Sequence, residues 1–176
     1  MIYVFLADGF EEIEALTPVD ILRRCGLEVE TVSICGEYVT GARKITVKAD
    51  TVIDKISDAQ MYILPGGLPG ADNLEACEKL CGILKDADKK GKYIAAICAA
   101  PKILGKLGIL KGKKATCYPG YENDLIGAEY TKSPVVSDGN VITANGMGSS
   151  AAFALELAGK LCDKADSVAK GILYNG

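Results

Sequence analysis

Cys98 is the residue whose sequence surroundings most suggest chemistry. It directly follows an apolar run at 93–97 and precedes Ala99, Ala100 and Pro101. Small residues at such a strand-to-helix turn permit the tight backbone that presents a nucleophile at the edge of a sheet. The N–H groups and positive dipole end of a helix start would favour the thiolate. A buried structural cysteine explains the same local sequence equally well, because free cysteine is among the most buried residue types.

A glycine-rich turn supplies a second feature and favours the reactive interpretation. Pro65-Gly66-Gly67 directly follows the apolar residues 61–64. Backbone N–H groups in such a loop can point into a crevice, and those of Gly67 and Ala99 could together form an oxyanion hole. The alternative is a plain tight turn at a strand exit. Neither glycine-rich phosphate-binding motif occurs in the chain, so we expect no nucleotide, and no other cofactor is indicated.

Three glutamates, Glu11, Glu12 and Glu14, follow the first apolar run. Such a cluster usually forms a solvated helix face; the alternative is that one carboxyl group points into the crevice beside Cys98. An ionised carboxylate there would raise the pKa of the thiol by repulsion, whereas a protonated one would donate a hydrogen bond to the thiolate and lower it. A functional glutamate should therefore have a raised pKa and could donate or accept a proton.

The absence of histidine limits the chemistry further. Papain-like and glutamine-amidotransferase triads need an imidazole to take the thiol proton, so neither can form within this chain. Seven cysteines without a secretory signal or a disulfide framework are expected as reduced thiols, which predicts a cytoplasmic protein. Cys77 and Cys81 do not have the CxxC spacing of zinc and redox sites, so we expect no metal.

Charge and hydropathy argue against two classes of partner. The net charge is −3 and basic residues form no dense cluster, so we expect neither nucleic acid nor an anionic membrane surface as a partner. No apolar run approaches the roughly 18 residues of a membrane-spanning helix. The length of 176 residues fits a single domain, residues 1–176, with one sizeable core.

Short apolar runs alternate with amphipathic segments along the chain. We expect core strands at 2–7, 27–34, 61–64 and 93–97, a further strand at 114–117, and hairpins within 36–50 and 135–144. We expect helices from Glu11, from a fresh start at Pro18 capped by Thr17 up to Cys25, at 73–90, at 100–107, and from Ser149 or Ser150 to about Cys162.

This alternation predicts the α/β class, as a flavodoxin-like three-layer sandwich with a mostly parallel central sheet. Sites in such folds lie beyond the carboxyl ends of the strands. Three turns are candidates to form the site at that edge of the sheet, at 8–14, 65–70 and 98–101.

Three segments at these turns, in this order, resemble the ThiJ/PfpI superfamily in the branch of the parkinsonism-associated deglycase. The similarity covers essentially the whole chain. The segments are Gly9-Phe10-Glu11-Glu12-Ile13-Glu14 followed by Pro18-Val19-Asp20 and Arg23-Arg24, then Leu64-Pro65-Gly66-Gly67 with Gly70, and finally Ala95-Ala96-Ile97-Cys98-Ala99-Ala100-Pro101.

The resemblance implies a role for individual residues. Cys98 matches the family's oxidisable nucleophile, Glu14 the protonated glutamate that hydrogen-bonds it, and Gly67 with Ala99 the amides of the oxyanion hole. The resemblance also implies a homodimer with the flavodoxin-like sheet. It places further residues at the pocket, with the two arginines also near the dimer contact: Gly66, Tyr118, Arg24 and Arg43.

The chain also departs from the pattern of that branch. The branch usually has a pocket histidine in a Thr-His-Pro context, and the matching run 116–119 places Tyr118 there. Tyrosine, with a pKa near 10, is a far weaker base than histidine at neutral pH. Met147 stands where the branch often has proline. Ala99 stands where related proteases have a histidine, so we do not expect peptidase activity. Cys117 either acts as a resolving thiol or packs beneath the pocket.

Three functions remain open at this point. The first is a glyoxalase-like or deglycase-like enzyme that acts on small reactive carbonyls through Cys98, with Glu14 as the proton partner. The second is a redox sensor or stress-linked chaperone in which an oxidant converts Cys98 to a sulfinate. The third is the thiazole-biosynthesis or kinase role that the ThiJ name suggests, and the missing nucleotide loop argues against it.

Overall fold

The centre of the molecule is a seven-stranded sheet in the order β10-β11-β7-β6-β1-β2-β5. The computed structural model describes residues 1–175. Neighbouring strands run parallel throughout, except that β10 and β11 form an antiparallel hairpin at one edge. The strands are β1 (Ile2–Leu6), β2 (Val29–Ser33), β5 (Thr51–Val52), β6 (Met61–Leu64), β7 (Tyr93–Ile97), β10 (Val135–Asp138) and β11 (Val141–Ala144).

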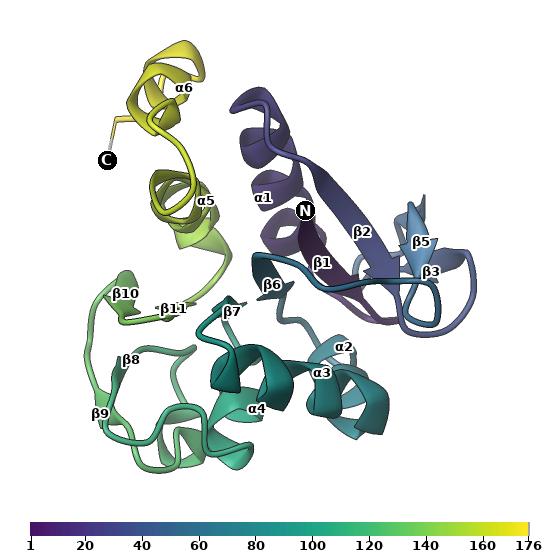
Figure 1. Ribbon diagram of the computed structural model, residues 1–176, viewed down its shortest axis with the longest axis vertical. Coiled ribbons are helices and arrows are strands. Elements are labelled where there is room, and N and C mark those ends of the chain that lie inside the picture. The colour runs from purple at the N-terminus through teal and green to yellow at the C-terminus, as the bar shows by residue number, and fades with distance from the viewer. Residues whose placement is uncertain (176) are drawn as a thin grey trace.

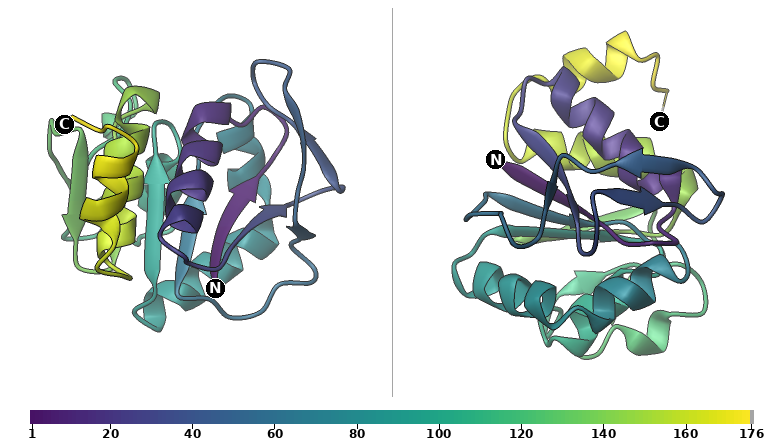
Figure 2. Two further views of the ribbon diagram at one scale, coloured as in Figure 1. Left: turned by 90° about the horizontal axis from the view of Figure 1, so that it is seen from above. Right: turned by 90° about the vertical axis from the view of Figure 1, so that its right-hand side faces the viewer.

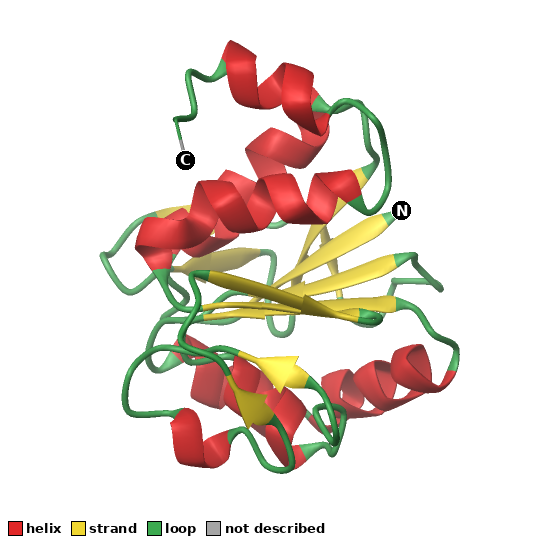
Figure 3. Ribbon diagram, turned by 90° about the vertical axis from the view of Figure 1, so that its left-hand side faces the viewer, coloured by secondary structure: helices red, strands yellow, loops and turns green. Residues whose placement is uncertain are grey.

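Helices cover both faces of this sheet (Figures 1 and 3). The helices α1, α5 and α6 lie on one side and α2, α3 and α4 on the other, as the right-hand view of Figure 2 shows. This arrangement confirms the three-layer α/β sandwich with a mostly parallel sheet. The helices are α1 (Glu12–Arg24), α2 (Gly70–Ala76), α3 (Glu78–Lys89), α4 (Pro101–Lys106), α5 (Ser150–Gly159) and α6 (Ala165–Gly171).

The core consists of two apolar clusters, one on each face of the sheet. Because successive side chains of a strand point to opposite faces, Val4 and Leu6 of β1 join one cluster and Tyr3 and Phe5 join the other. Every residue of β1 is buried. This two-sided burial explains why the strand is a continuous apolar run rather than an alternating pattern.

The first helix corrects one expectation. The sequence predicts a fresh start at Pro18, but α1 runs unbroken from Glu12 to Arg24 with Pro18 inside it. A proline at this place removes only one backbone hydrogen bond, to the carbonyl of Glu14. Burial of the helix's inner face holds the turn together. The buried residues there include Ala15, Val19 and Leu22.

Other element boundaries also differ from the expectations. The single helix expected at 73–90 is divided, because Cys77 is extended and separates α2 from α3. The strand expected at 114–117 is only β8 (Lys114–Ala115), which pairs with β9 (Glu129–Tyr130) outside the central sheet. The hydroxyl of Ser149 bonds to the side chain of Asn145 instead of capping α5. The helix α6 was not expected.

The two predicted hairpins are both present. One is β10 with β11, and the other is β3 (Tyr38–Thr40) with β4 (Thr46–Lys48), which stands apart from the central sheet. Within residues 1–175, no helix combines the length and the apolar character that spanning a bilayer would require.

Candidate active site

The carboxyl ends of four neighbouring parallel strands bring the candidate residues to one cavity of about 390 Å³. Glu11 and Glu14 follow β1, Gly67 follows β6, Cys98 follows β7, and Met147 follows β11. This is the edge at which the predicted turns were expected to meet. The complete lining is Glu11, Glu14, Ala42, Arg43, Gly67, Leu68, Cys98, Ala99, Tyr118, Tyr121 and Met147.

Cys98 occupies a strained turn between β7 and α4. Its φ of 64° lies in the left-handed region, where a residue other than glycine costs about 1–2 kcal/mol. Two backbone hydrogen bonds impose this conformation: the N–H of Cys98 donates to the carbonyl of Ala144, and its carbonyl accepts from the N–H of Tyr118, both at 2.9 Å. The turn therefore fixes the sulfur at the base of the cavity, as expected for a nucleophile elbow.

Glu14 is the buried acid of the site, with only 1% of its surface exposed. One of its carboxyl oxygens, Oε2, accepts a hydrogen bond of 2.9 Å from the N–H of Gly66. The same carboxyl group lies beside the thiol of Cys98, and each of the two groups shifts the pKa of the other. The first turn of α1 thus places a carboxyl group in direct contact with the candidate nucleophile.

The two glycines between β6 and α2 allow this contact. A Cβ atom at Gly66 would lie 2.7 Å from both the Cβ of Cys98 and Oε2 of Glu14, which is too close for any side chain. Gly67 has a φ of +86°, which glycine adopts without penalty. The N–H of Glu11 donates to the carbonyl of Gly66 at 3.0 Å and joins the two loops. The turn is therefore part of the site's construction.

Burial raises the pKa of Glu14 to about 7, and the hydrogen bonds from Cys98 and Gly66 offset part of that effect. The sequence predicted a raised pKa for a functional glutamate here. Near neutral pH the carboxyl group therefore exists in both its protonated and its ionised form, which is the condition for donating and accepting a proton during one reaction.

The protonation of Glu14 controls Cys98. Burial and the charge of ionised Glu14 raise the pKa of the thiol to about 12, while the N–H groups of Ala99 and Gly67 act in the opposite direction. When Glu14 is protonated, the repulsion disappears and the carboxyl O–H can donate to the sulfur, which lowers the pKa of Cys98. The two groups therefore titrate as one pair that shares a proton.

The expected contribution of a helix terminus to the thiolate is not found. The helix α4 has six residues and begins only at Pro101. The groups that favour a charged sulfur are instead the two N–H groups of Ala99 and Gly67, on separate loops. Both N–H groups therefore act in favour of the charged form of the sulfur.

All three glutamate side chains are largely shielded from solvent, which contradicts the expectation of a solvated face. Glu12 is 5% exposed and its Oε1 accepts a hydrogen bond of 2.7 Å from the N–H of Arg43. The side chain of Glu11 is 12% exposed and its Oε2 lies 4.0 Å from the guanidinium of Arg43. Glu11 and Glu12 therefore hold the β3–β4 connection against the cavity, and Glu14 faces Cys98.

Arg43 and Tyr118 both line the cavity. The side chain of Arg43 is largely exposed at the rim. Tyr118 is 51% exposed, and its ring lies against Gly146. Gly66 lies beneath the cavity, between Cys98 and Glu14, and is not among the lining residues.

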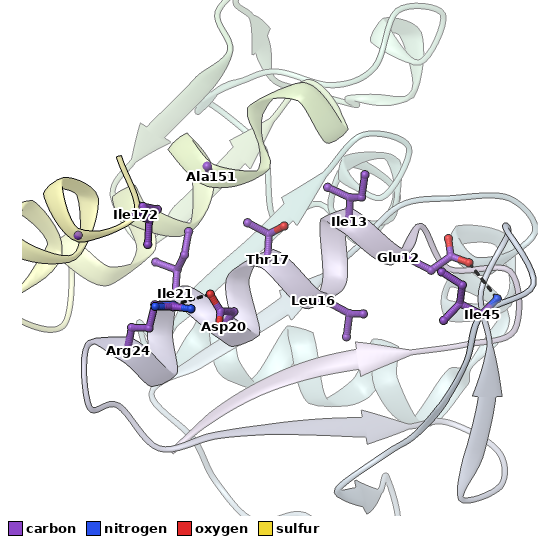
Figure 4. A pocket seen from close by; sticks show the side chains of 11 residues that line it. Glu12, Ile13, Leu16, Thr17, Asp20, Ile21, Arg24, Ile45, Ala151 and Ile172 are labelled. Carbon is purple, nitrogen blue, oxygen red and sulfur yellow. Dashed lines mark hydrogen bonds and ion pairs between the residues drawn. The ribbon is translucent and has the colours of Figure 1, made fainter. Parts of the chain in front are cut away.

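Arg24 does not line this cavity within the single chain. It ends α1, ten residues after Glu14, which is about 15 Å along the helix axis. Its side chain is exposed and pairs with Asp20 at 2.6 Å, which raises its pKa. Arg24 lines a different hollow of about 740 Å³ on the outer face of α1, beside Ala151 and Ile172 (Figure 4).

Cys117 lies apart from the cavity, although it is adjacent in sequence to Tyr118. It is 1% exposed and belongs to the apolar cluster on the α2–α4 side of the sheet, whereas Cys98 packs against the cluster on the α1–α5 side. Of the two sequence-based interpretations, this position supports packing over a resolving thiol.

Three lining residues were not predicted from the sequence, namely Leu68, Tyr121 and Ala42. Leu68 follows the glycine turn and is 51% exposed, so an apolar residue in a strand-exit loop was the available signal. Tyr121 lies beneath the ammonium of Lys102, 5.6 Å from the ring centroid, and no local pattern predicts that contact. Ala42 reaches the cavity because Glu12 holds the β3–β4 connection there through the N–H of Arg43.

Comparisons with known proteins agree with this geometry. The sequence model of the DJ-1/PfpI family matches residues 1–160. The chain is 36% identical to the protein dj-1beta of Drosophila melanogaster, over 98% of this chain and 97% of that one. It is 34% identical to a deglycase of Pyrococcus horikoshii, over 78% of this chain and 85% of the other.

A solved structure titled as oxidized DJ-1 of Toxoplasma gondii superimposes with a TM-score of 0.95 at 35% identity. The match covers 99% of this chain and 98% of that chain. The similarity therefore extends through the whole fold, including α6 and the loops that form the cavity.

Proposed function

Because the chain belongs to the DJ-1/PfpI family, we propose that it acts on small reactive carbonyl compounds through Cys98, with Glu14 as its proton partner. The observation that carries the proposal is the neighbouring pair of Cys98 and Glu14 at one cavity, where the N–H groups of Ala99 and Gly67 favour the thiolate. Two archaeal relatives bear the name deglycase, which supports the substrate class.

The proposed first step is addition of the sulfur to an aldehyde. The form of the pair with a thiolate at Cys98 and a carboxylic acid at Glu14 is the reactive one. A sulfur lone pair forms the C–S bond, and the carbonyl π electrons move to oxygen, where the N–H groups of Gly67 and Ala99 stabilise the charge. Glu14 then gives its proton to that oxygen and yields a neutral hemithioacetal.

A 2-oxoaldehyde would continue from this intermediate. Glu14, now a carboxylate, removes the hydrogen from the hemithioacetal carbon and leaves an enediolate. The hydroxyl proton on that carbon passes to the neighbouring oxygen, and Glu14 returns its proton to the neighbouring carbon. The carbon bonded to sulfur thereby becomes a thioester carbonyl. Water hydrolyses the thioester, which releases a 2-hydroxy acid and restores the thiol. A buried carboxyl group with a pKa of about 7 is suited to both transfers.

The test is release of lactate from methylglyoxal by the native protein and by Cys98→Ser. We expect loss of essentially all activity in the variant, with Cys117→Ser retaining the native rate as a matched control. The kcat/KM of the native protein should rise as the pH passes through about 7, because the pair must lose its first proton. Equal background rates in the native protein and Cys98→Ser would refute the carbonyl proposal.

A second candidate function is redox sensing by oxidation of Cys98 to the sulfinate. The N–H groups of Ala99 and Gly67 could hold sulfinate oxygens, and a protonated Glu14 could donate to one of them. Mass spectrometry after mild peroxide treatment tests this function. Cys98 should gain two oxygens before the other cysteines do; preferential oxygenation elsewhere would exclude a sensor based on this site.

We further propose that the protein is a cytoplasmic homodimer that contacts its copy through the outer face of α1. Ile13 and Ile45 are 47% and 53% exposed on this face, beside Leu16 (Figure 4). All seven cysteines are free thiols, as a reducing compartment allows. Sedimentation analysis of the native protein and Ile13→Glu tests the dimer, and a native monomer at micromolar concentration would exclude it.

A further inference from the structure

A second pair of thiols lies at the opposite end of α1 from Glu14. Cys25 directly follows α1 and is 2% exposed. Cys162 lies in the segment between α5 and α6 and is partly exposed. Neither residue lines the cavity at Cys98. Cys25 follows Glu14 by eleven residues, about 16 Å along a helix axis, so the pair is separate from the proposed active site.

The packing of α1 against α5 brings these thiols together. Leu22 of α1 and Leu157 of α5 belong to the same buried cluster as Cys25, and Cys162 packs against its edge. Figure 1 shows α5, α6 and α1 along the same side of the sheet. The segment after α5 also reaches the end of α1, and Cys162 is near enough to Cys25 to raise its pKa, so two thiols 137 positions apart in sequence are neighbours.

Backbone hydrogen bonds fix both residues. The N–H of Cys25 donates to the carbonyl of Ile21 at 3.1 Å, and the N–H of Cys162 donates to the carbonyl of Ala158 at 2.9 Å. Each cysteine therefore continues the last turn of its helix. The backbone of both residues is therefore fixed by hydrogen bonds to the helices that precede them.

A cation lies beside the pair. The Nζ atom of Lys164 would be 3.5 Å from a Cβ atom at Gly26, the residue next to Cys25. Its charge lowers the pKa of Cys25, although burial is the larger effect and raises that pKa to about 11. Cys25 is therefore a sheltered thiol, and the partly exposed Cys162 is the member of the pair that an oxidant in solution can reach.

The other cysteines have different surroundings. The Sγ atom of Cys81 donates to the carbonyl of Glu75 at 3.4 Å. Cys35 shares a 3.6 Å hydrogen bond with the hydroxyl of Ser33. Cys117 lies near the carboxylates of Glu122 and Asp124. Cys81 also has a thiol neighbour, Cys77, but the two stand four positions apart around a helix start, whereas Cys25 and Cys162 come from two different helix ends.

We propose that Cys25 and Cys162 are a redox-active pair that closes to an intramolecular disulfide when the protein meets a peroxide. The Cys162 sulfur attacks one peroxide oxygen, the O–O bond breaks, and a sulfenic acid and one water form. The Cys25 sulfur then attacks the sulfenic sulfur, the S–S bond forms, and the sulfenic oxygen leaves as a second water. Two thiols are oxidised by two electrons while one hydrogen peroxide is reduced.

The bond would join the end of α1 covalently to the segment that leads into α6. Without it, α6 is attached through α5, which precedes it in the chain, and through noncovalent contacts. A thiol such as glutathione can reverse the bond by exchange at the exposed sulfur. The oxidised protein would thus carry a reversible tie that does not involve Cys98.

The experiment treats the full-length native protein with a small molar excess of hydrogen peroxide, alkylates the remaining thiols and maps disulfides by mass spectrometry without reduction. Trypsin with a glutamate-specific protease separates Cys25 from Cys35, because Glu28 lies between them. We expect the thiols of Cys25 and Cys162 to be lost together, with a peptide containing both residues that disappears on reduction.

Three variants sharpen the result. Cys98→Ser should form the same cross-linked peptide, which shows that the pair reacts independently of the proposed active site. Cys162→Ser should not form it, and Cys81→Ser is the matched control that should. The thermal midpoint of the native protein should rise on oxidation, while that of Cys162→Ser should not, because a bridge restricts only the native protein's unfolded chain.

Several outcomes would overturn the proposal. One is complete alkylation of Cys25 after Cys162 has been oxidised to a sulfinic acid. Another is a cross-link of Cys25 to any cysteine other than Cys162. A third is a Cys162–Cys162 bond between two chains. Activity toward carbonyls does not enter any of these readouts, so failure of the disulfide and failure of the proposed function are separable.

Discussion

Burial changes the pKa of Cys98 and of Cys117 in the same direction, but the two thiols have different neighbours. Burial raises the pKa of both, to about 12 and about 11, and neighbouring carboxylates add to each shift. The two segments are joined next to these residues, since the N–H of Tyr118, which follows Cys117, donates to the carbonyl of Cys98. Cys98, however, contacts a titratable carboxyl group and two N–H groups from separate loops at a cavity, whereas Cys117 lies inside an apolar cluster.

The difference shows that burial alone does not make a thiol reactive. Both sulfur atoms would be neutral if burial were the only influence. At Cys98 the adjacent carboxyl group has a pKa near neutrality, so a proton can move between the two side chains without leaving the pair. Cys117 lies near the carboxylates of Glu122 and Asp124, which act on its pKa through their charge.

The largest expected effect is that of removing the proton partner. Glu14→Gln should lower kcat/KM on methylglyoxal by about 10²- to 10⁴-fold, the usual contribution of a general acid–base group. Glutamine can accept the Gly66 hydrogen bond but cannot exchange a proton with Cys98, so the rise in rate near pH 7 should also disappear. Cys117→Ser should change neither quantity, and a Glu14→Gln enzyme with the native pH profile would contradict the paired titration.

The pair should also leave a signature in stability. The pKa of Glu14 is raised from 4.5 unfolded to about 7 folded, so the native state holds the proton more tightly. The resulting stabilisation is complete below pH 4.5 and is lost as the pH rises through 7, by about 3 kcal/mol in total. Urea unfolding at pH 5 and pH 8 measures it, and no histidine titrates in this window.

Glu14→Gln is the control for this measurement. The variant should show a nearly level free energy of unfolding over the same pH range, because the amide does not titrate. An equal pH dependence in the native protein and the variant would assign the effect to other groups and remove the argument for a raised pKa.

A smaller effect is expected from filling the space beneath the pair. Gly66→Ala should destabilise the fold by about 1–3 kcal/mol, since its methyl group would displace either Cys98 or Glu14. Activity should fall along with stability. Gly82→Ala is the matched control: it lies inside α3 with open space around it, and alanine there should be neutral or stabilising by up to about 1 kcal/mol.

The smallest expected effect concerns the rim of the cavity. Tyr118→His restores the residue type that the family pattern led us to expect, and an imidazole near Cys98 should raise kcat/KM by only a few-fold because the position is half-exposed. Tyr118→Phe is the control and should match the native rate. An unchanged pH profile in Tyr118→His would show that Glu14 carries proton transfer alone.

Local sequence was sufficient for the centre of the site. The apolar runs at β1, β6 and β7 end within a few residues of Glu11, Gly66 and Cys98, and parallel strands place such ends together. Position along one helix was harder to predict: Glu11, Glu12 and Glu14 look alike in sequence, and only packing shows that Glu14 meets Cys98.

Contacts between distant segments account for the errors. Glu12 binds the backbone of Arg43, 31 positions away, and this bond brings Arg43 to the cavity while Arg24 remains at the far end of α1. The helix boundary expected at Pro18 was wrong because tertiary packing outweighs one missing hydrogen bond. These effects depend on which surfaces meet, and local pattern does not contain that information.

The positive φ of Cys98 lowers the stability of the fold, yet it belongs to the residue that the proposed chemistry needs. Glycine would adopt this conformation without the roughly 1 kcal/mol penalty that a side chain brings. Selection for foldability alone would therefore replace the cysteine, and a design method guided only by stability would remove the nucleophile first.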